Sequence, residues 1–225
     1  MLKQVLHVKS IFLCFVEDKK IEKIYMIEEK EQESMKDFII EVVKMFLLAL
    51  VIIVPVRMFL FQPFIVRGAS MEPNFSEKQY LIVNEFGYKN TPVNVLGKNL
   101  VTINPRKDLD RYDIVVFRAP VDKKQYYIKR VIGLPGETVE IDNGVVMIYN
   151  DENPEGRVLD ESAYLPEGRK TNGTIKVEIG EDEYYVLGDN RPASSDSRTF
   201  GPITKDDVIG KVLIRAWPPS DMTIF

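Results

Sequence analysis

The sequence has one cysteine and one histidine among its 225 residues, and this scarcity excludes whole classes of site. With Cys14 alone, the chain can form neither an internal disulfide framework nor a cysteine cluster that binds a metal. The single histidine, His7, leaves no histidine-rich set of zinc ligands. The sequence therefore predicts no metal site.

A basic excess is also missing. Lys and Arg number 30 and Asp and Glu number 34, which gives a net charge of −4. Nucleic-acid-binding proteins normally concentrate basic residues on one face to displace counterions. We therefore expect no nucleic-acid partner. The length suits one ordinary domain with a tail or an anchor.

The most apolar stretch, residues 42–61, spans about 30 Å as a helix, which matches the hydrocarbon core of a bilayer. Lys44 and Arg57 interrupt it, but long cationic side chains near helix ends can reach the interface. Pro55 should kink the helix. We interpret residues 37–62 as a transmembrane anchor helix. A buried core helix is the alternative, which the apolar side chains on all faces disfavour.

Residues 1–36 form a mixed-charge segment without a core-forming pattern, which is typical of a partly helical or disordered tail. We expect residues 1–34 to be dispensable or to lie upstream of the natural start, because Met35 would begin a membrane-anchored protein sensibly. The lysines on the amino side of the anchor slightly favour a cytoplasmic amino terminus.

The remainder, residues 63–225, has the pattern of a β protein. Eight short runs rich in Val, Ile, Tyr and Phe are separated by Gly, Pro, Asn and Asp. These runs are YLIVNEF, DIVVFRAP, YYIKRVIG, ETVEI, VVMIYN, TIKVEIG, EYYVLG and VIGKVLIRAW. Asn143 and Gly144 predict a tight hairpin because both tolerate positive φ. We expect a mainly β fold, an antiparallel barrel or sandwich, with irregular inserts at residues 91–108 and 150–173.

Ser70 lies in the turn-like stretch GASMEP, directly after the apolar segment. If it were a nucleophile it would need a base, and His7 lies on the far side of the proposed membrane span. A lysine or a carboxylate remains. A serine beside glycine is, however, more often a simple turn former.

Lys129 is the candidate base. A lysine has a pKa of about 10.4 in water and must be buried in apolar surroundings to be neutral near pH 7.5. In strand alternation Lys129 shares a face with Tyr127 and Val131, and Arg130 points away. The spacing alone favours the alternative, in which Lys129 and Arg130 form a solvated pair on an exposed face.

A third stretch, LGDNRPASSDSRTFG, gathers polar residues after an apolar strand. A flexible surface loop would have this composition. Alternating Asp and Arg can also pair and make a loop rigid, and Ser hydroxyls can orient a neutral amine.

Together these stretches resemble the type I signal peptidases, serine proteases with a Ser-Lys dyad. The resemblance runs from Met35 onwards and rests on the anchor and on GASMEP, DIVVFRAP, YIKRVIGLPGE and GDNRPASSDSR, in this order. It implies an all-β catalytic domain outside the cytoplasmic membrane and no cofactor. Its expected substrates are pre-proteins whose signal peptides end in small residues.

The resemblance also implies roles for individual residues. Ser70 would be the nucleophile, Lys129 the general base, and Ser194 the hydroxyl that helps to position the lysine. The supporting residues would be Asp196, Arg198, Asp189, Asn190 and Arg130. The anchor implies lipid contact and keeps Ser70 within about 30 Å of Phe61 even along an extended chain.

The sequence departs from the family pattern at several positions. Asn74 stands where Thr is usual, Tyr112 where Gly commonly precedes the DIVVF strand, and Pro192 with Ala193 where polar residues are common. Gly68 replaces a second hydroxyl that some members carry, so an oxyanion would depend on backbone N–H groups. Another Ser-Lys protease, such as a self-cleaving repressor, and a non-catalytic membrane-anchored β binding module remain alternatives.

Overall fold

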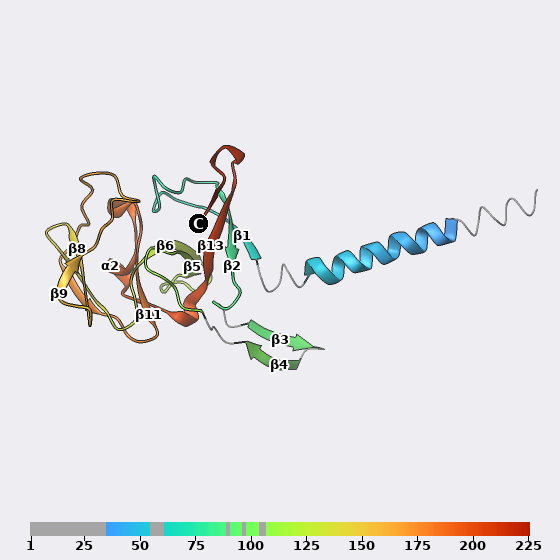
Figure 1. Ribbon diagram of the computed structural model, residues 1–225, viewed down its shortest axis with the longest axis horizontal. Helices are drawn as coiled ribbons and strands as arrows, with labels where there is room; N and C mark the ends of the chain where they lie inside the picture. The colour runs from blue at the N-terminus through green and yellow to red at the C-terminus, as the bar shows by residue number, and fades with distance from the viewer. Residues whose placement is uncertain (1–34, 55–60, 89–90, 96–97, 104–106) are drawn as a thin grey trace, which may run out of the picture. The chain divides into compact units, whose positions relative to one another are not determined.

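A computed structural model describes residues 35–54, 61–88, 91–95, 98–103 and 107–225 (Figure 1). The chain divides into two units, one ending at Val54 and the other beginning at Pro55. The predictions for the tail at residues 1–34 and for a kink at Pro55 lie outside the described residues.

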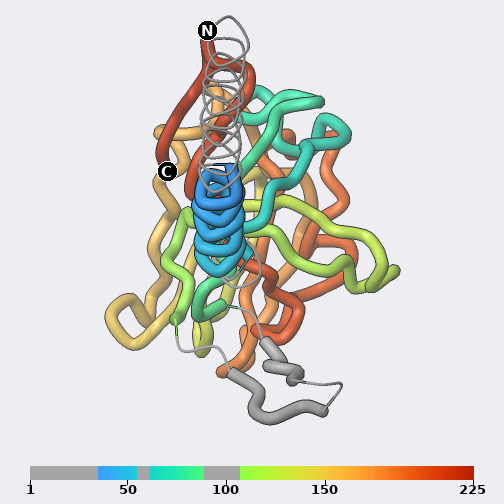
Figure 2. Tube along the Cα trace, turned by 90° about the vertical axis from the view of Figure 1, so that its right-hand side faces the viewer, coloured from blue at the N-terminus to red at the C-terminus, as the bar shows by residue number. Residues whose placement is uncertain are grey.

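The first unit contains a helix over residues 35–54, drawn in blue in Figures 1 and 2. All of its residues are exposed except Ala49, which is half-buried. Among the described residues, no helix combines the length and the apolar character needed to cross a membrane. Phe61 and Gln62, which we assigned to the anchor, instead belong to the first strand of the second unit.

The second unit is built from antiparallel β-sheets, as the sequence predicts. The largest sheet has eight strands in the order β1-β2-β13-β5-β6-β11-β12, with β14 paired to β13. Its strands are β1 (Phe61–Ile65), β2 (Tyr80–Asn84), β5 (Ile114–Arg118), β6 (Tyr126–Gly133), β11 (Glu183–Leu187), β12 (Ile203–Thr204), β13 (Val208–Trp217) and β14 (Thr223–Ile224). Figure 2 shows the last strand turning back along β13 in red.

The second sheet contains four strands in the order β10-β7-β8-β9. They are β7 (Thr138–Asp142), β8 (Val145–Asn150), β9 (Asn153–Val158) and β10 (Ile175–Glu178). Asn143 and Gly144 join β7 to β8 with φ values of 52° and 86°, which confirms the predicted hairpin. A third pair, β3 (Thr91–Val95) and β4 (Lys98–Ile103), forms a separate two-stranded ribbon.

Strand burial follows residue type. β5 reads IVVFR and is buried over its first four residues, as expected for a strand covered on both faces. β2 alternates between buried and more exposed residues because only one of its faces meets the core. β13 pairs with β2, β5 and β14, and its register shifts within the pairings with β2 and β5.

Three apolar clusters form the core of this unit. One lies with the four-stranded sheet and includes Val139, Ile148, Leu165 and Tyr185. A second gathers Met71, Phe75, Leu81 and Ile209 below the turn that carries Ser70. The third contains Val115, Phe117, Val131 and Tyr184, along β5, β6 and β11. The β6 strand that carries Lys129 therefore contributes to all three clusters, through Ile128, Val131 and Ile132.

All eight runs predicted as strands are strands in the structure, but the two supposedly irregular inserts also contain strands. β3 and β4 occupy the first insert and β9 the second. β9 reads NPEGRV, and its proline and glycine conceal it from a propensity argument. β1 contains Pro63 and lies at the edge of its sheet, where a missing N–H group is tolerated. The short elements α2 (Ser197–Phe200), η1 (Arg191–Ala193), η2 (Lys205–Asp207) and η3 (Pro219–Asp221) complete the described unit.

Gly210 allows β13 to approach β2 closely, and its replacement by alanine tests this packing. A Cβ atom at residue 210 would overlap the carbonyl oxygen of Asn84 and lie 2.8 Å from its carbonyl carbon, and a strand backbone cannot give way as a side chain can. We expect Gly210→Ala to lower the free energy of unfolding by about 3 kcal/mol in urea titrations. Gly180→Ala is the matched control, because its Cβ would meet only the flexible Glu183 side chain. Equal stability of the two variants would contradict the tight contact.

Candidate active site

Ser70 lies in a turn that follows β1, and buried apolar residues hold this turn in place. Met71 and Phe75 are completely buried in the second apolar cluster, and the Phe75 N–H donates to the Met71 carbonyl over 2.9 Å. Gly68 has φ +80°, a conformation that glycine adopts without strain, and it opens the turn. These two buried residues, which follow the serine in the chain, therefore hold the turn in place while Ser70 itself stays half-buried.

Lys129 points from β6 to this turn, and its Nζ lies 2.8 Å from Ser70 Oγ. The side chain is 3% exposed, and Nζ also donates to the Ile128 carbonyl over 2.8 Å. The solvated Lys129–Arg130 pair that local spacing favoured is wrong, because Arg130 is buried too. Their burial depends on segments that are distant in the sequence and fold over β6.

Burial lowers the pKa of the Lys129 amine from 10.5 to about 8, while the carboxylates of Asp196 and Asp189 oppose this by raising it. The Tyr127 ring, with its centroid 5.4 Å from Nζ, covers part of the amine. A useful fraction of Lys129 is then neutral near pH 7.5 to 8, and a neutral amine can accept the proton of the adjacent hydroxyl.

The polar loop after β11 lies directly against the serine turn. Asn190 donates its backbone N–H to the Ser70 carbonyl and its side-chain Nδ2 to the Ala69 carbonyl, each over 3.0 Å. Gly188 has no room for a Cβ atom, which would overlap the Ser194 side chain and lie 2.5 Å from the Ser70 carbonyl oxygen. The loop thus holds the backbone of the nucleophile candidate from one side.

The Ser194 side chain lies against Gly188, close to the serine turn, but no hydrogen bond joins it to Lys129. Its Oγ is buried and finds no hydrogen-bond partner of ordinary geometry among the described residues. It lies close enough to the Asp196 carboxylate to help lower the pKa of that group. Its predicted role in positioning the lysine stays a prediction.

Asp196 and Arg198 form a buried ion pair that shapes the same loop. Arg198 Nε and one of its terminal nitrogens each lie 2.8 Å from a different Asp196 oxygen, and the Gly188 N–H donates to Asp196 over 3.0 Å. Burial by itself would raise the pKa of Asp196, but the hydrogen bonds from Arg198 and Gly188 hold it below its usual value. The carboxylate therefore stays ionised and closes the loop.

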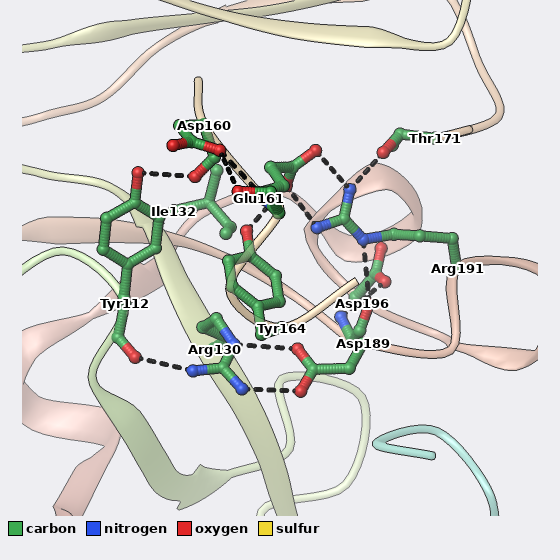
Figure 3. A network of polar contacts seen from close by, with 12 residues as sticks. Tyr112, Arg130, Ile132, Asp160, Glu161, Tyr164, Thr171, Asp189, Arg191 and Asp196 are labelled. Carbon is green, nitrogen blue, oxygen red and sulfur yellow. Dashed lines mark hydrogen bonds and ion pairs between the residues drawn. The ribbon is translucent and has the colours of Figure 1, made fainter. Parts of the chain in front are cut away.

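A second buried pair, Arg130 with Asp189, joins β6 to the loop (Figure 3). Arg130 Nε and a terminal nitrogen donate to the two Asp189 oxygens over 2.9 and 2.6 Å. Asn74 donates to the same carboxylate over 2.8 Å and to the Tyr164 carbonyl over 2.7 Å. The Asp189 carboxylate thus joins the serine turn, the lysine strand and the polar loop.

Several residues of this network had no role in our sequence analysis. Asn74 and Tyr112 appeared there only as departures from a family pattern. Tyr112 has φ +74°, which explains why glycine suits this position, and its carbonyl accepts from Arg130 over 3.0 Å. Pro192 and Ala193 lie in η1. Glu161 and Tyr164 belong to an insert whose sequence has no periodic pattern, so only their polarity could have marked them.

An apolar cleft of about 630 Å³ opens beside Ser70 and Lys129. One wall comes from β1 and the serine turn, and the other from the end of the β5–β6 loop and the start of β6. The lining residues are Phe64, Ile65, Val66, Arg67, Gly68, Ala69, Ser70, Leu81, Val116, Lys124, Gln125, Tyr126, Tyr127, Ile128, Lys129, Ala193 and Ser195. Within the described ranges, no group of three or more His, Cys, Asp or Glu residues could hold a metal ion.

Comparison with known proteins identifies relatives for about four fifths of the chain. A family model described as "Signal peptidase, peptidase S26" matches residues 39–217. Signal peptidase I P of Bacillus subtilis subsp. natto is 35% identical over 192 residues, which cover 81% of this chain and 90% of that protein. Signal peptidase IB of Staphylococcus aureus strain COL is 33% identical over 198 residues, covering 83% and 94%. A crystal structure of a signal peptidase I from Enterococcus faecalis V583 is 32% identical and covers 47% of this chain and 97% of its own, with a TM-score of 0.38.

The buried amine has a consequence for stability that can be measured. The unfolded chain keeps its Lys129 proton up to pH 10.5, whereas the folded chain releases it near pH 8. Between these values the unfolded state binds more protons, so the contribution of Lys129 to stability rises with pH across this interval and is lowest below it. We expect Lys129→Met to be about 2 kcal/mol more stable than the parent at pH 7. This advantage should shrink as the pH rises towards 10.

Urea titrations of both proteins between pH 7 and pH 10 measure this difference. Lys170→Met, at an exposed lysine, is the control for adding an apolar side chain. A Lys129→Met variant that is less stable than the parent at pH 7, or a difference that does not change with pH, would contradict the burial of an ionisable amine.

Proposed function

Since this chain belongs to the signal peptidase family, peptidase S26, and is therefore a peptidase, we propose that it removes signal peptides from exported pre-proteins with Ser70 as nucleophile and Lys129 as general base. The observation that carries this proposal is the 2.8 Å separation of Ser70 Oγ and Lys129 Nζ. The lowered pKa of the amine, which follows from its burial, supports it. A serine next to a neutral amine needs no cofactor to act as a nucleophile.

The reaction proceeds by two acyl transfers. Neutral Lys129 takes the hydroxyl proton while Ser70 Oγ attacks the carbonyl carbon of the scissile bond. The ammonium then gives this proton to the departing amine, and the mature protein leaves an acyl-enzyme on Ser70. Lys129, neutral again, takes a proton from water as the water oxygen attacks the ester carbonyl carbon. It then gives this proton to Ser70 Oγ as the ester bond breaks and the signal peptide leaves.

The negative oxygen formed in each step needs hydrogen-bond donors. The Ser70 backbone N–H has no acceptor among the described residues, whereas the Ser70 carbonyl is already held by Asn190. The free N–H therefore lies on the residue that attacks and can bind the oxyanion. Gly68 adds no hydroxyl there.

The cleft suits an extended peptide. β6 pairs with β5 over Tyr126–Arg130, but its partner on the other side, β11, contacts only residues 130–133. No second strand among the described residues pairs with residues 126–129, which line the cleft, so a substrate strand can add backbone hydrogen bonds at this edge. The apolar lining favours small uncharged side chains next to the scissile bond, as the family resemblance implies.

We further assign this enzyme to the cell membrane, as a single-pass protein with its catalytic unit on the extracytoplasmic side. The support is the apolar sequence from residue 42 up to Phe61, which is short of charges, and the exposed apolar side chains of the helix. A pre-protein held in the same membrane would present its cleavage site at a raised effective concentration.

Single substitutions of the dyad test the chemistry. We expect Ser70→Ala and Lys129→Ala to reduce cleavage of a pre-protein in lipid vesicles by at least about 1,000-fold, because each removes one of the two reacting groups. Ser76→Ala and Lys170→Ala, which change exposed residues outside the cleft, are matched controls. Full cleavage by a folded Ser70→Ala variant would exclude this mechanism and leave a different protease or a binding module.

Membrane attachment is tested separately. We expect the full chain to stay with vesicles after an alkaline wash, because apolar insertion does not depend on charge. A variant that begins at Phe61 should remain in the supernatant. Protease added outside intact cells should digest the catalytic unit. Release of the full chain by the wash, or protection of the unit from external protease, would contradict the proposed location.

A further inference from the structure

Arg191 of the polar loop forms a third ion pair, with the half-buried Glu161, and this pair has no part in the chemistry described so far (Figure 3). Arg191 is 1% exposed, so its guanidinium is removed from water. It donates to both Glu161 oxygens, to the Thr171 hydroxyl and to the Gly188 carbonyl, the last over 3.0 Å. A buried cation with this many partners is fixed in position.

The Arg191 contacts lead directly to the serine turn. The Gly188 carbonyl that Arg191 holds belongs to the residue whose missing side chain leaves room for Ser194 and the Ser70 carbonyl. Two residues further on, Asn190 holds the Ser70 and Ala69 carbonyls. The Arg191 side chain thus holds the first residue of the short segment whose last residue contacts the serine turn.

Glu161 connects the same pair to the lysine strand. Tyr164 donates its hydroxyl to Glu161 over 2.7 Å, and its ring lies 4.2 Å from the Arg130 guanidinium. The Tyr164 carbonyl accepts from Asn74, four residues after Ser70. Glu161 therefore meets both sides of the proposed site, through Arg191 on one side and through Tyr164 on the other.

Glu161, Tyr164 and Thr171 come from the insert between β9 and β10 of the second sheet, and not from the strands that carry the dyad. Leu159, Tyr164 and Leu165 pack in the core cluster of the four-stranded sheet. Thr171 is completely buried, and its N–H donates to the Gly144 carbonyl in the β7–β8 hairpin. The insert therefore links the four-stranded sheet to the loop beside Ser70, because it packs on the sheet and binds Arg191.

We propose that Glu161 and Arg191 are positioning residues for the Ser70–Lys129 pair, and that their ion pair holds Gly188–Asn190 against the serine turn and keeps water away from the lysine. This inference rests on the proposed function. Loss of the Glu161 charge frees the loop, so water reaches the amine and the serine leaves its attacking position. Arginine suits the task because its planar fork serves several acceptors at once.

The sign of the effect on pH dependence follows from the cause of the Lys129 shift. Burial lowers the pKa of this amine, so hydration of the site raises it towards 10.5. The ionisable groups closest to Lys129 are Asp189 and Asp196 from the loop and Tyr127 on its own strand, with Arg130 and Arg198 paired to the two carboxylates. Arg67, Lys124 and Tyr126 line the same cleft. A Glu161 substitution leaves all of these in the chain.

The experiment compares the full chain with Glu161→Gln in vesicles, by measuring kcat and KM for a pre-protein between pH 6 and pH 10. Glutamine keeps the size of the side chain and removes its charge. We expect kcat to fall about 10- to 100-fold with KM changed less than about threefold. The acidic limb of the kcat/KM profile should move to higher pH by about half a unit or more.

Glu140→Gln is the matched control. Glu140 accepts from Tyr149 and Lys176, as Glu161 does from Tyr164 and Arg191, but this triad lies on the four-stranded sheet, outside the proposed site. It should leave kcat and the acidic limb unchanged. If Glu161→Gln lowers the melting temperature but also leaves kcat and the limb unchanged, the pair serves stability alone and the inference is wrong.

Thr171→Val provides a milder test should Glu161→Gln fail to fold. It removes one acceptor of Arg191 and keeps the ion pair, so we expect a smaller fall in kcat and a shift of the limb in the same direction. An unchanged kcat and limb in a folded Thr171→Val would then overturn the inference. The proposed function fails by a different result, cleavage by Ser70→Ala, so the two failures are distinguishable.

Discussion

The removal of one ammonium group from water is the constraint on which this structure depends. Lowering the pKa of Lys129 from 10.5 to about 8 corresponds to roughly 3 kcal/mol of disfavoured charge. This exceeds the roughly 1 kcal/mol that an ordinary hydrogen bond contributes. The contact with Ser70 therefore cannot hold the lysine in place by itself. The enclosure has to come from the rest of the fold, namely the packed strand β6, the Tyr127 ring and the loop that closes over the serine turn.

The acidic groups of that loop oppose the effect of burial on the pKa of Lys129, and each of them has an arginine partner. Asp189 and Asp196 both raise the pKa of Lys129, so free carboxylates there would favour its charged form. Each is instead paired to a guanidinium, Asp189 to Arg130 and Asp196 to Arg198, at distances of 2.6 and 2.8 Å. The paired carboxylates shape the loop through their hydrogen bonds, and burial outweighs their opposing effect on the pKa of Lys129.

The sequence predicted most of the strands, but it predicted less of how the candidate site is enclosed. Local alternation was sufficient for eight strands and for the Asn143–Gly144 turn, because these features depend on neighbouring residues. The same local argument failed for Lys129 and Arg130, whose burial is decided by the turn at Ser70 and by the loop after β11, both about 60 residues away. The family resemblance singled out Ser70 and Lys129, which the structure brings together. It could not indicate Glu161, because the insert that carries this residue has neither a strand period nor a motif.

Asn74 shows how a departure from a family pattern becomes part of the site. Its amide donates two hydrogen bonds, to the Asp189 carboxylate and to the Tyr164 carbonyl. A threonine hydroxyl has a single proton to donate and could satisfy one of these acceptors at most. The asparagine therefore attaches the serine turn both to the loop and to the insert that carries Glu161. Since the insert in turn packs on the four-stranded sheet, the two sheets of the catalytic unit jointly determine the geometry of the proposed nucleophile.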